Sequence, residues 1–168
     1  MIDLETLSTR TDAAIVEIGA CTFSKEKGVE TMFEVGVKAD VGHIKPATVM
    51  WWLSQEEQAR LNLQAAFQDG KSTARMLEDF MSWVAHNTHS PQDVTYWAKP
   101  AAFDLAILRY HADSLGFKDW PSFRQDRCMR EWMKGRDTPQ KARSGTAHRA
   151  LDDAISQAEW MLAAGFDE

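Results

Sequence analysis

Hydrophobic and polar residues near the start of the chain follow the pattern of β-strands. Residues 1–5, 13–23 and 31–37 each combine apolar runs with alternating positions, which is typical of strands buried on at least one face. A polar turn signal at residues 25–28 separates the last two. Three strands in succession predict an antiparallel meander.

Helical periodicity replaces this alternation after Pro46. Residues 47–53 are mostly apolar and follow a proline that fits the first turn of a helix. Ser54 and Glu57 have the spacing of a capping box, which predicts a new helix from Ser54. Apolar residues then recur at helical spacing over residues 72–84. The middle of the chain is therefore predicted to be helical.

The second half of the chain mixes strand and helix patterns. Residues 94–97 are β-prone, and a helical period over residues 105–115 ends at Gly116. Residues 123–133 carry a strand-edge and a basic-helix pattern that cannot be separated, and a last helix is predicted over residues 149–164. This order of elements predicts an α/β sandwich around a mixed sheet.

The composition is that of an ordinary globular protein. The chain has 168 residues, of which 44% are apolar and 26% are charged, and this length predicts a single domain over residues 1–168. No apolar run approaches the roughly 20 residues of a membrane helix. Because there is no signal segment either, we expect a cytoplasmic protein without membrane contact. Cys21 and Cys128 lack metal-ligand spacing and are expected to be reduced thiols.

Charge is distributed unevenly along the chain. The net charge of −6 argues against a protein that passively wraps a nucleic-acid backbone, although not against a nuclease whose site holds metal ions. Residues 122–149 contain eight Lys or Arg and three Asp or Glu, a local balance of +5. This basic segment fits either an edge that faces phosphate groups or a solvated helix face.

Two carboxylates in the predicted first strand are the first sign of chemistry. Asp3 and Glu5 lie two residues apart, so in a strand they point to the same side. Two like charges held together are costly unless a cation lies between them, and hard oxygen ligands suit Mg²⁺ or Mn²⁺. A solvated strand edge is the alternative. Only Met1 and Ile2 precede Asp3, so this strand is expected to be short or to begin upstream.

Two later segments offer partners for this pair. Asp104 falls in the first turn of a predicted helix, where the helix dipole by itself also favours a carboxylate. His148 and Asp153 are five residues apart and would lie on different faces of one helix. They can share a site only if His148 precedes the helix that contains Asp153. Asp152 competes with Asp153, because both lie off the apolar stripe.

Together these residues follow the order of a known set of motifs. The chain contains Asp3-x-Glu5, Phe103-Asp104 and His148-x-Ala150-x-x-Asp153. This series resembles the three motifs of the DEDDh 3′→5′ exonucleases. Residues 48–53 (TVMWWL) resemble a narrower phage and bacterial subgroup, the exodeoxyribonuclease VIII-like or small 3′→5′ exoribonucleases. The resemblance implies an RNase H-like three-layer α/β sandwich. Its mixed five-stranded sheet would join the antiparallel meander to parallel strands between flanking helices.

The resemblance also implies a reaction, the hydrolysis of nucleic-acid 3′ ends to nucleoside 5′-monophosphates. Two Mg²⁺ or Mn²⁺ ions, about 4 Å apart, would be held by four carboxylates. The carboxylates implied are those of Asp3, Glu5, Asp104 and Asp153. His148 would act as the general base. The family spacing selects Asp153 as the ligand, so Asp152 is expected to be exposed.

Contacts to the terminal nucleotide are implied for residues beside the first motif. These residues are Leu4, Thr6 and Leu7, although Leu7 fits a local core equally well. Trp51 or Trp52 could stack a base, but adjacent residues on a helix point about 100° apart, so one of the two is expected in the core. Phe103 is a further candidate contact that also fits the core. We expect core positions for Trp97, Trp120, Trp132 and Trp160, and surface or loop positions for His43, His86, His89 and His111.

Three functions from different classes are consistent with these features. The first is a metal-dependent 3′→5′ exonuclease acting on RNA or single-stranded DNA. The second is a catalytically inactive module that binds nucleic acid or a partner; loss of a ligand would indicate it, and none is missing. The third is a phosphatase acting on small substrates. RNA and DNA are not distinguished, because contacts to the 2′-OH cannot be placed. A homodimer, in which one subunit's basic edge serves the other's site, is a prediction by analogy.

Overall fold

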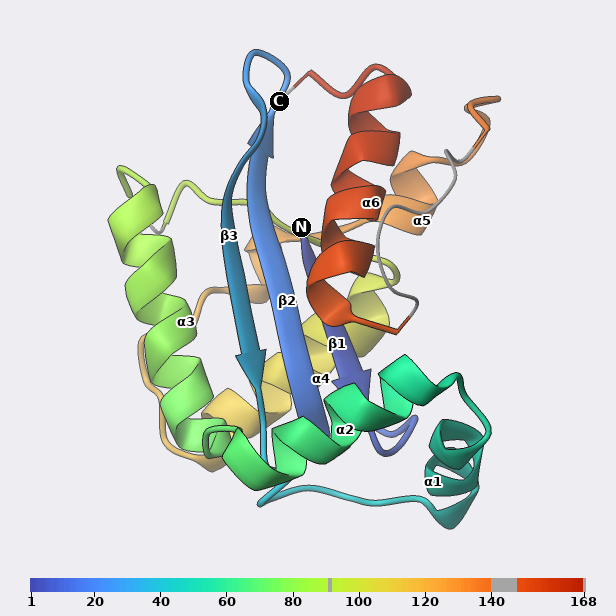
Figure 1. Ribbon diagram of the computed structural model, residues 1–168. Helices are drawn as coiled ribbons and strands as arrows, with labels where there is room; N and C mark the ends of the chain where they lie inside the picture. Colours follow the sequence, from blue (N-terminus) through green and yellow to red (C-terminus); the bar gives the residue numbers. More distant parts are fainter. Residues whose placement is uncertain (91, 140–147, 168) are drawn as a thin grey trace.

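The computed structural model describes residues 1–90, 92–139 and 148–167 (Figure 1). Its strands are β1 (Ile2–Thr6), β2 (Ile15–Ser24), β3 (Gly28–Gly36), β4 (Tyr96–Ala98) and β5 (Asp126–Cys128). Its helices are α1 (Pro46–Leu53), α2 (Glu57–Asp69), α3 (Thr73–Asn87), α4 (Ala101–Ser114), the 3-10 helix η1 (Phe123–Gln125), α5 (Met129–Trp132) and α6 (Ala150–Ala163). The expectation of a mixed α/β protein is therefore confirmed.

The strands hydrogen-bond as two sheets in the described residues. β1, β2 and β3 form an antiparallel sheet in that order, which confirms the predicted meander. β4 and β5 pair in parallel, with Ala98 opposite Cys128 at the end of the ladder. β1 packs beside β4, but the backbone ladders do not join the strands into one five-stranded sheet.

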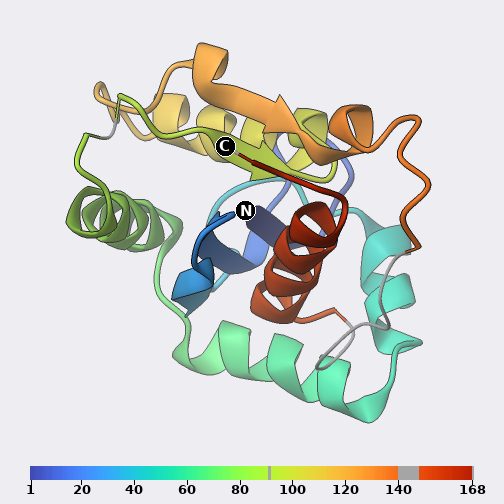
Figure 2. The ribbon, with the colours of Figure 1, turned by 90° about the horizontal axis from the view of Figure 1, so that it is seen from above.

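Helices cover both faces of the antiparallel sheet. Side chains alternate along β1, so that Ile2 and Leu4 enter the core shared with α3 and α4. Asp3 and Glu5 point to the opposite face, where α6 lies across β1, β2 and β3. Figures 1 and 2 show α6 on one side of the sheet and α4 on the other. This layering leaves the two carboxylates beneath the N-terminal half of α6.

Helix starts depend on which groups cap them. Ser72 caps α3, because its Oγ accepts a hydrogen bond of 3.3 Å from the Arg75 N–H. The prediction of a helix from Ser54 was wrong, since α2 begins at Glu57 without a side-chain cap. The Ser54 hydroxyl instead donates to the Trp51 carbonyl at 2.7 Å and helps to end α1.

The structure resolves the mixed pattern of residues 123–133 and corrects the predicted position of His111. η1, β5 and α5 together occupy residues 123–132, so this segment contains both a strand and a helix. The prediction that His111 lies on the surface was wrong, because its side chain is 2% exposed. A ring nitrogen of His111, Nε2, lies 2.7 Å from the Ala13 carbonyl oxygen. This contact ties α4 to the chain that enters β2.

Candidate metal centre

Three carboxylates meet on the face of the sheet that α6 covers. Asp3 and Glu5 come from β1, and Asp153 comes from the first turn of α6. One oxygen from each lies within 4.8 Å of the others. Asp153 is buried, whereas Asp3 and Glu5 are half-buried. We call these three residues the acidic cluster.

Gly19 allows α6 to approach the sheet closely enough to form this cluster. Gly19 lies on β2 directly opposite Asp3. A Cβ atom at this position would lie 2.0 Å from the Leu151 nitrogen and 2.1 Å from the Ala150 carbonyl carbon. Because these are backbone atoms, no rotamer change could relieve the overlap. Sequence reasoning missed Gly19, although a glycine inside a strand pattern is a known sign of close backbone approach.

Asp104 lies next to the acidic cluster and is held by a backbone group of β1. Its side chain is 3% exposed, and Oδ1 accepts a hydrogen bond of 3.0 Å from the Leu4 N–H. Leu4 stands between Asp3 and Glu5, so this bond fixes the start of α4 against the same stretch of strand. Burial raises the pKa of Asp104 to about 7, although the Leu4 N–H, the carboxyl's own backbone N–H and the charge of Arg130 all oppose the rise.

Asp3 is strongly affected by its surroundings. Burial raises the pKa of Asp3 well above its usual value, and the charges of Asp104, Glu5 and Asp153 raise it further. Gln157 opposes this rise by donating a hydrogen bond of 2.7 Å from Nε2 to Asp3 Oδ1. Gln157 lies one turn after Asp153 on α6 and was missed by sequence reasoning. Repelling carboxylates at this spacing fit a hard divalent cation such as Mg²⁺ or Mn²⁺.

A second group of charged residues borders the cluster. Glu17 lies opposite Glu5 in the β1–β2 ladder. Burial raises the pKa of Glu17 to about 8, helped by a hydrogen bond to Glu34 on β3 and by the nearby charges of Glu34 and Glu5. Glu34 in turn accepts two hydrogen bonds from Arg149, of 2.7 and 2.8 Å. Arg149 is the residue just before α6, so this pair fastens the helix start to β3.

His148 precedes α6. This is the arrangement that His148 and Asp153 need if they are to share a site. Its backbone has a left-handed φ of 61°, and its ring packs edge-on against Trp51 with 4.8 Å between centroids. Trp51 is 43% exposed. Trp52 is 2% exposed and donates a hydrogen bond of 2.9 Å from Nε1 to the Thr6 carbonyl. The expectation that one of the two tryptophans belongs to the core is therefore confirmed for Trp52.

The other sequence candidates lie mainly within the protein. Leu4, Thr6 and Leu7 are buried, and the Thr6 hydroxyl donates to the Ser8 carbonyl at 2.8 Å. Phe103 is half-buried and packs against the main core. The prediction that Asp152 is exposed was wrong, because its side chain is only 17% exposed and lies 3.9 Å from Arg149. It stands outside the acidic cluster all the same.

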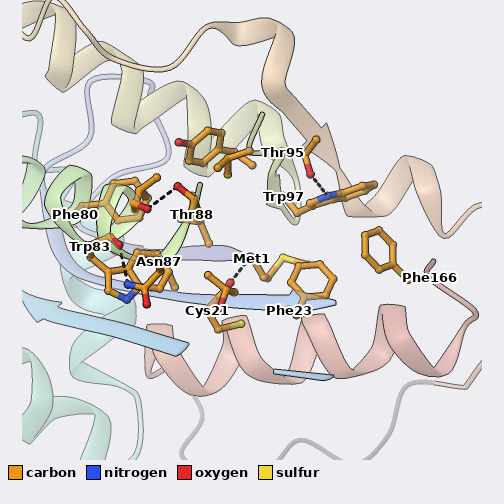
Figure 3. A pocket seen from close by; sticks show the side chains of 16 residues that line it. Met1, Cys21, Phe23, Phe80, Trp83, Asn87, Thr88, Thr95, Trp97 and Phe166 are labelled. Atoms are coloured by element: carbon orange, nitrogen blue, oxygen red, sulfur yellow. Dashed lines mark hydrogen bonds between the residues drawn. The ribbon is translucent and has the colours of Figure 1, made fainter. Parts of the chain in front are cut away.

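A mostly apolar cavity lies elsewhere in the molecule. A space of about 260 Å³ opens at the start of β1, between the sheet and the end of α3. Figure 3 shows Met1, Trp83, Trp97 and Phe166 around it. Its walls are mostly apolar and include no carboxylate or imidazole. This cavity is therefore separate from the acidic cluster. In the described residues, no helix is long and apolar enough to cross a membrane.

Comparison with known proteins places the chain in a family. The sequence pattern of the family described as "3'-5' exoribonuclease Rv2179c-like domain" matches residues 1–164. The chain belongs to this family. An exodeoxyribonuclease of Enterobacteria phage T4 is 25% identical over 120 residues, which are 64% of this chain and 52% of that protein. The match thus spans about half the length of this relative.

A solved structure shares the fold of this member of the Rv2179c-like family. The crystal structure of cell-death related nuclease 4 (CRN-4) matches with a TM-score of 0.57 and 13% identity, over 96% of this chain and 61% of that one. At this identity the likeness concerns the fold alone. The expectation of a 3′→5′ exonuclease family is confirmed by the family match. The narrower assignment to the DEDDh type is taken up as a proposal below.

Proposed function

We propose that this chain is a DEDDh-type 3′→5′ exonuclease with an RNase H-like fold and one catalytic domain. Its substrates are the 3′ ends of RNA or single-stranded DNA, and its products are nucleoside 5′-monophosphates. The observation that carries the proposal is the acidic cluster, in which three carboxylate oxygens lie within 4.8 Å of one another. The family description as an exoribonuclease domain favours RNA.

The carboxylates of this site suit divalent cations. Asp3, Glu5 and Asp153 would hold them, together with Asp104 from the start of α4. Carboxylate oxygens are the ligands that Mg²⁺ and Mn²⁺ prefer. When bound, two such ions lower the pKa of a water and offset negative charge on the phosphate group that is cut. The raised pKa of Asp3 is consistent with this assignment, since its main causes are burial and the neighbouring carboxylates, whose repulsion a cation would offset.

His148 is the proposed general base. An imidazole can accept a proton near neutral pH, and a ring nitrogen of His148 would take it from the attacking water. His148 lies outside α6, five residues before Asp153 and directly before Arg149, the residue that precedes the helix. Its contact with Trp51 limits the positions that the ring can occupy.

Trp51 is the proposed contact for the terminal base. Its indole ring is exposed and already lies against His148, so a base stacked on it would end close to the general base. Such stacking contributes about 1–3 kcal/mol per base. Leu4, Thr6 and Leu7 have buried side chains. Any contact that these residues make to the nucleotide would therefore come from their backbone atoms.

Gln157 and Asp104 are proposed to keep Asp3 in place. Gln157 holds one oxygen of Asp3 from α6. Asp104 holds the Leu4 N–H on the neighbouring residue. Between them they restrain β1 from two sides, which is the kind of support that precise metal ligation requires.

Degradation of a single-stranded oligonucleotide labelled near its 5′ end tests this function. We expect a ladder of products shortened from the 3′ end only with Mg²⁺ or Mn²⁺, and release of nucleoside 5′-monophosphates. Asp153→Ala and His148→Ala should each abolish the ladder. Asp152→Asn is the matched control, because it removes a neighbouring carboxylate outside the acidic cluster, and it should retain most activity. Full activity in the Asp153 or His148 variant would remove these assignments.

A further inference from the structure

The parallel strands β4 and β5 bring an acidic and a basic residue to one edge. Ala98, which ends β4, lies opposite Cys128, which ends β5. The chain after β4 enters α4, which carries Asp104, and the chain after β5 enters α5, which carries Arg130. Because parallel strands end at the same edge of their sheet, Arg130 emerges on the side where Asp104 meets β1.

Three other basic side chains near β5 already have partners. Arg127 donates to the Arg124 and Asp126 carbonyls at 2.8 and 3.0 Å, and Lys134 pairs with Glu131 at 2.6 Å. The Arg136 guanidinium lies over the Trp132 ring, 3.8 Å from its centroid. These contacts favour a structural role for each of the three cations.

Arg130 differs from these residues. Its side chain is exposed, and no hydrogen bond or ion pair joins that side chain to another residue in the part of the chain that the structure describes. Its charge nevertheless acts on the Asp104 carboxyl. An exposed guanidinium close to Asp104 and the acidic cluster offers a hydrogen-bond donor to an anion that approaches the cluster.

The position of Arg130 indicates which phosphate it would meet. Asp104 is buried, and the phosphate that is cut would lie at the carboxylates and their ions. Arg130 is exposed at the rim, so it faces a neighbouring part of the strand. On the basis of the proposed function, we propose that Arg130 binds the phosphodiester next to the one being cut, on a single strand whose 3′ end enters the acidic cluster.

Steady-state kinetics on two substrates test this role. The first is a single-stranded oligonucleotide, and the second is the p-nitrophenyl ester of thymidine 5′-monophosphate, which has one phosphodiester and no neighbour. For Arg130→Ala we expect the loss of kcat/KM to be about tenfold greater on the oligonucleotide than on the ester, as for one charged hydrogen-bonded contact. Arg130→Lys should recover part of the oligonucleotide activity, because it keeps the charge but not the fork geometry.

Arg124→Ala is the matched control. Arg124 is also exposed and lies in the same segment, but it precedes β5 and so stands at the opposite end of that strand. Arg124→Ala should change kcat/KM by the same factor for the two substrates. The slope of log kcat/KM for the oligonucleotide against log salt should fall by about 0.7 in Arg130→Ala, the value for one phosphate contact on a single strand. It should not fall in this way in Arg124→Ala.

The outcomes separate this role from the proposed function. A loss in Arg130→Ala that is no greater on the oligonucleotide than on the ester would overturn the role, because the effect would then act through the acidic cluster. If the wild type cleaves neither substrate, the proposed nuclease function fails. Binding of the same oligonucleotide, followed by fluorescence anisotropy in EDTA, then decides the role of Arg130. A salt slope unchanged by Arg130→Ala would overturn it, and a reduced slope would support it.

Discussion

Replacing Asp104 with asparagine should stabilise the metal-free protein at high pH. The amide oxygen of Asn can still accept the hydrogen bond that the Leu4 N–H donates to Oδ1, while the buried negative charge is removed. The pKa of Asp104 is raised from 3.8 to about 7 by burial. At pH values between these two pKa values, the Asp104 carboxyl is ionised in the unfolded chain but still protonated in the folded chain. Stability must therefore fall as pH rises through this range, and it levels off above about pH 7.

The size of the effect follows from the shift. Each pKa unit corresponds to about 1.4 kcal/mol, so ionising Asp104 between pH 5 and pH 7 costs the wild type roughly 3 kcal/mol. The raised pKa of Glu17, about 8, acts in the same direction. Its contribution remains in both proteins and cancels when the variant is compared with the wild type. Asp104→Asn should thus gain about 3 kcal/mol over the wild type on going from pH 5 to pH 8.

Urea unfolding at pH 5 and pH 8 in EDTA measures this difference. Asp113→Asn is the control, because Asp113 is exposed on the same helix, and its pH dependence should match the wild type. If Asp104→Asn loses as much stability between the two pH values as the wild type does, burial of this charge does not set the stability of the site. The variant should also be inactive as a nuclease at either pH.

Further substitutions test the packing around the site and the proposed stacking of a base. Gly19→Ala should destabilise the protein by more than about 3 kcal/mol in urea unfolding, because its methyl group would overlap the α6 backbone. Gly36→Ala, whose nearest new contact is 3.4 Å, should cost about 1 kcal/mol or less; equal costs would contradict the close-approach argument. Trp52→Phe should cost about 1–3 kcal/mol, because it leaves the buried Thr6 carbonyl without its indole donor; an unchanged unfolding midpoint would contradict this. Trp51→Ala should raise KM for an oligonucleotide about tenfold with little loss of stability, and an unchanged KM would exclude stacking.

The sequence predicted the features that depend on short-range periodicity. The two-residue spacing of Asp3 and Glu5 places both on one face of β1, and the alternation of apolar residues predicted the meander. The five-residue separation of His148 and Asp153 required the histidine to lie outside α6, and it does. In each case the inference needed only the geometry of a single element.

Features that depend on contacts between distant segments were not predictable in this way. Gly19 matters because α6, more than a hundred residues later, crosses β2 at that point. Gln157 reaches Asp3 across a similar separation. His111 was predicted to lie on the surface, but its ring is buried against the Ala13 carbonyl. The Ser54 capping pattern was misleading because the end of α1 uses the same hydroxyl group.

The central claim is that Asp3, Glu5 and Asp153, with Asp104 beside them, hold divalent ions. Calorimetric titration of the metal-free protein with Mn²⁺ tests it most directly. We predict saturable binding in the wild type and in Asp152→Asn, with a large loss of affinity in Asp153→Asn. Equal Mn²⁺ affinity in Asp153→Asn and the wild type would contradict the claim.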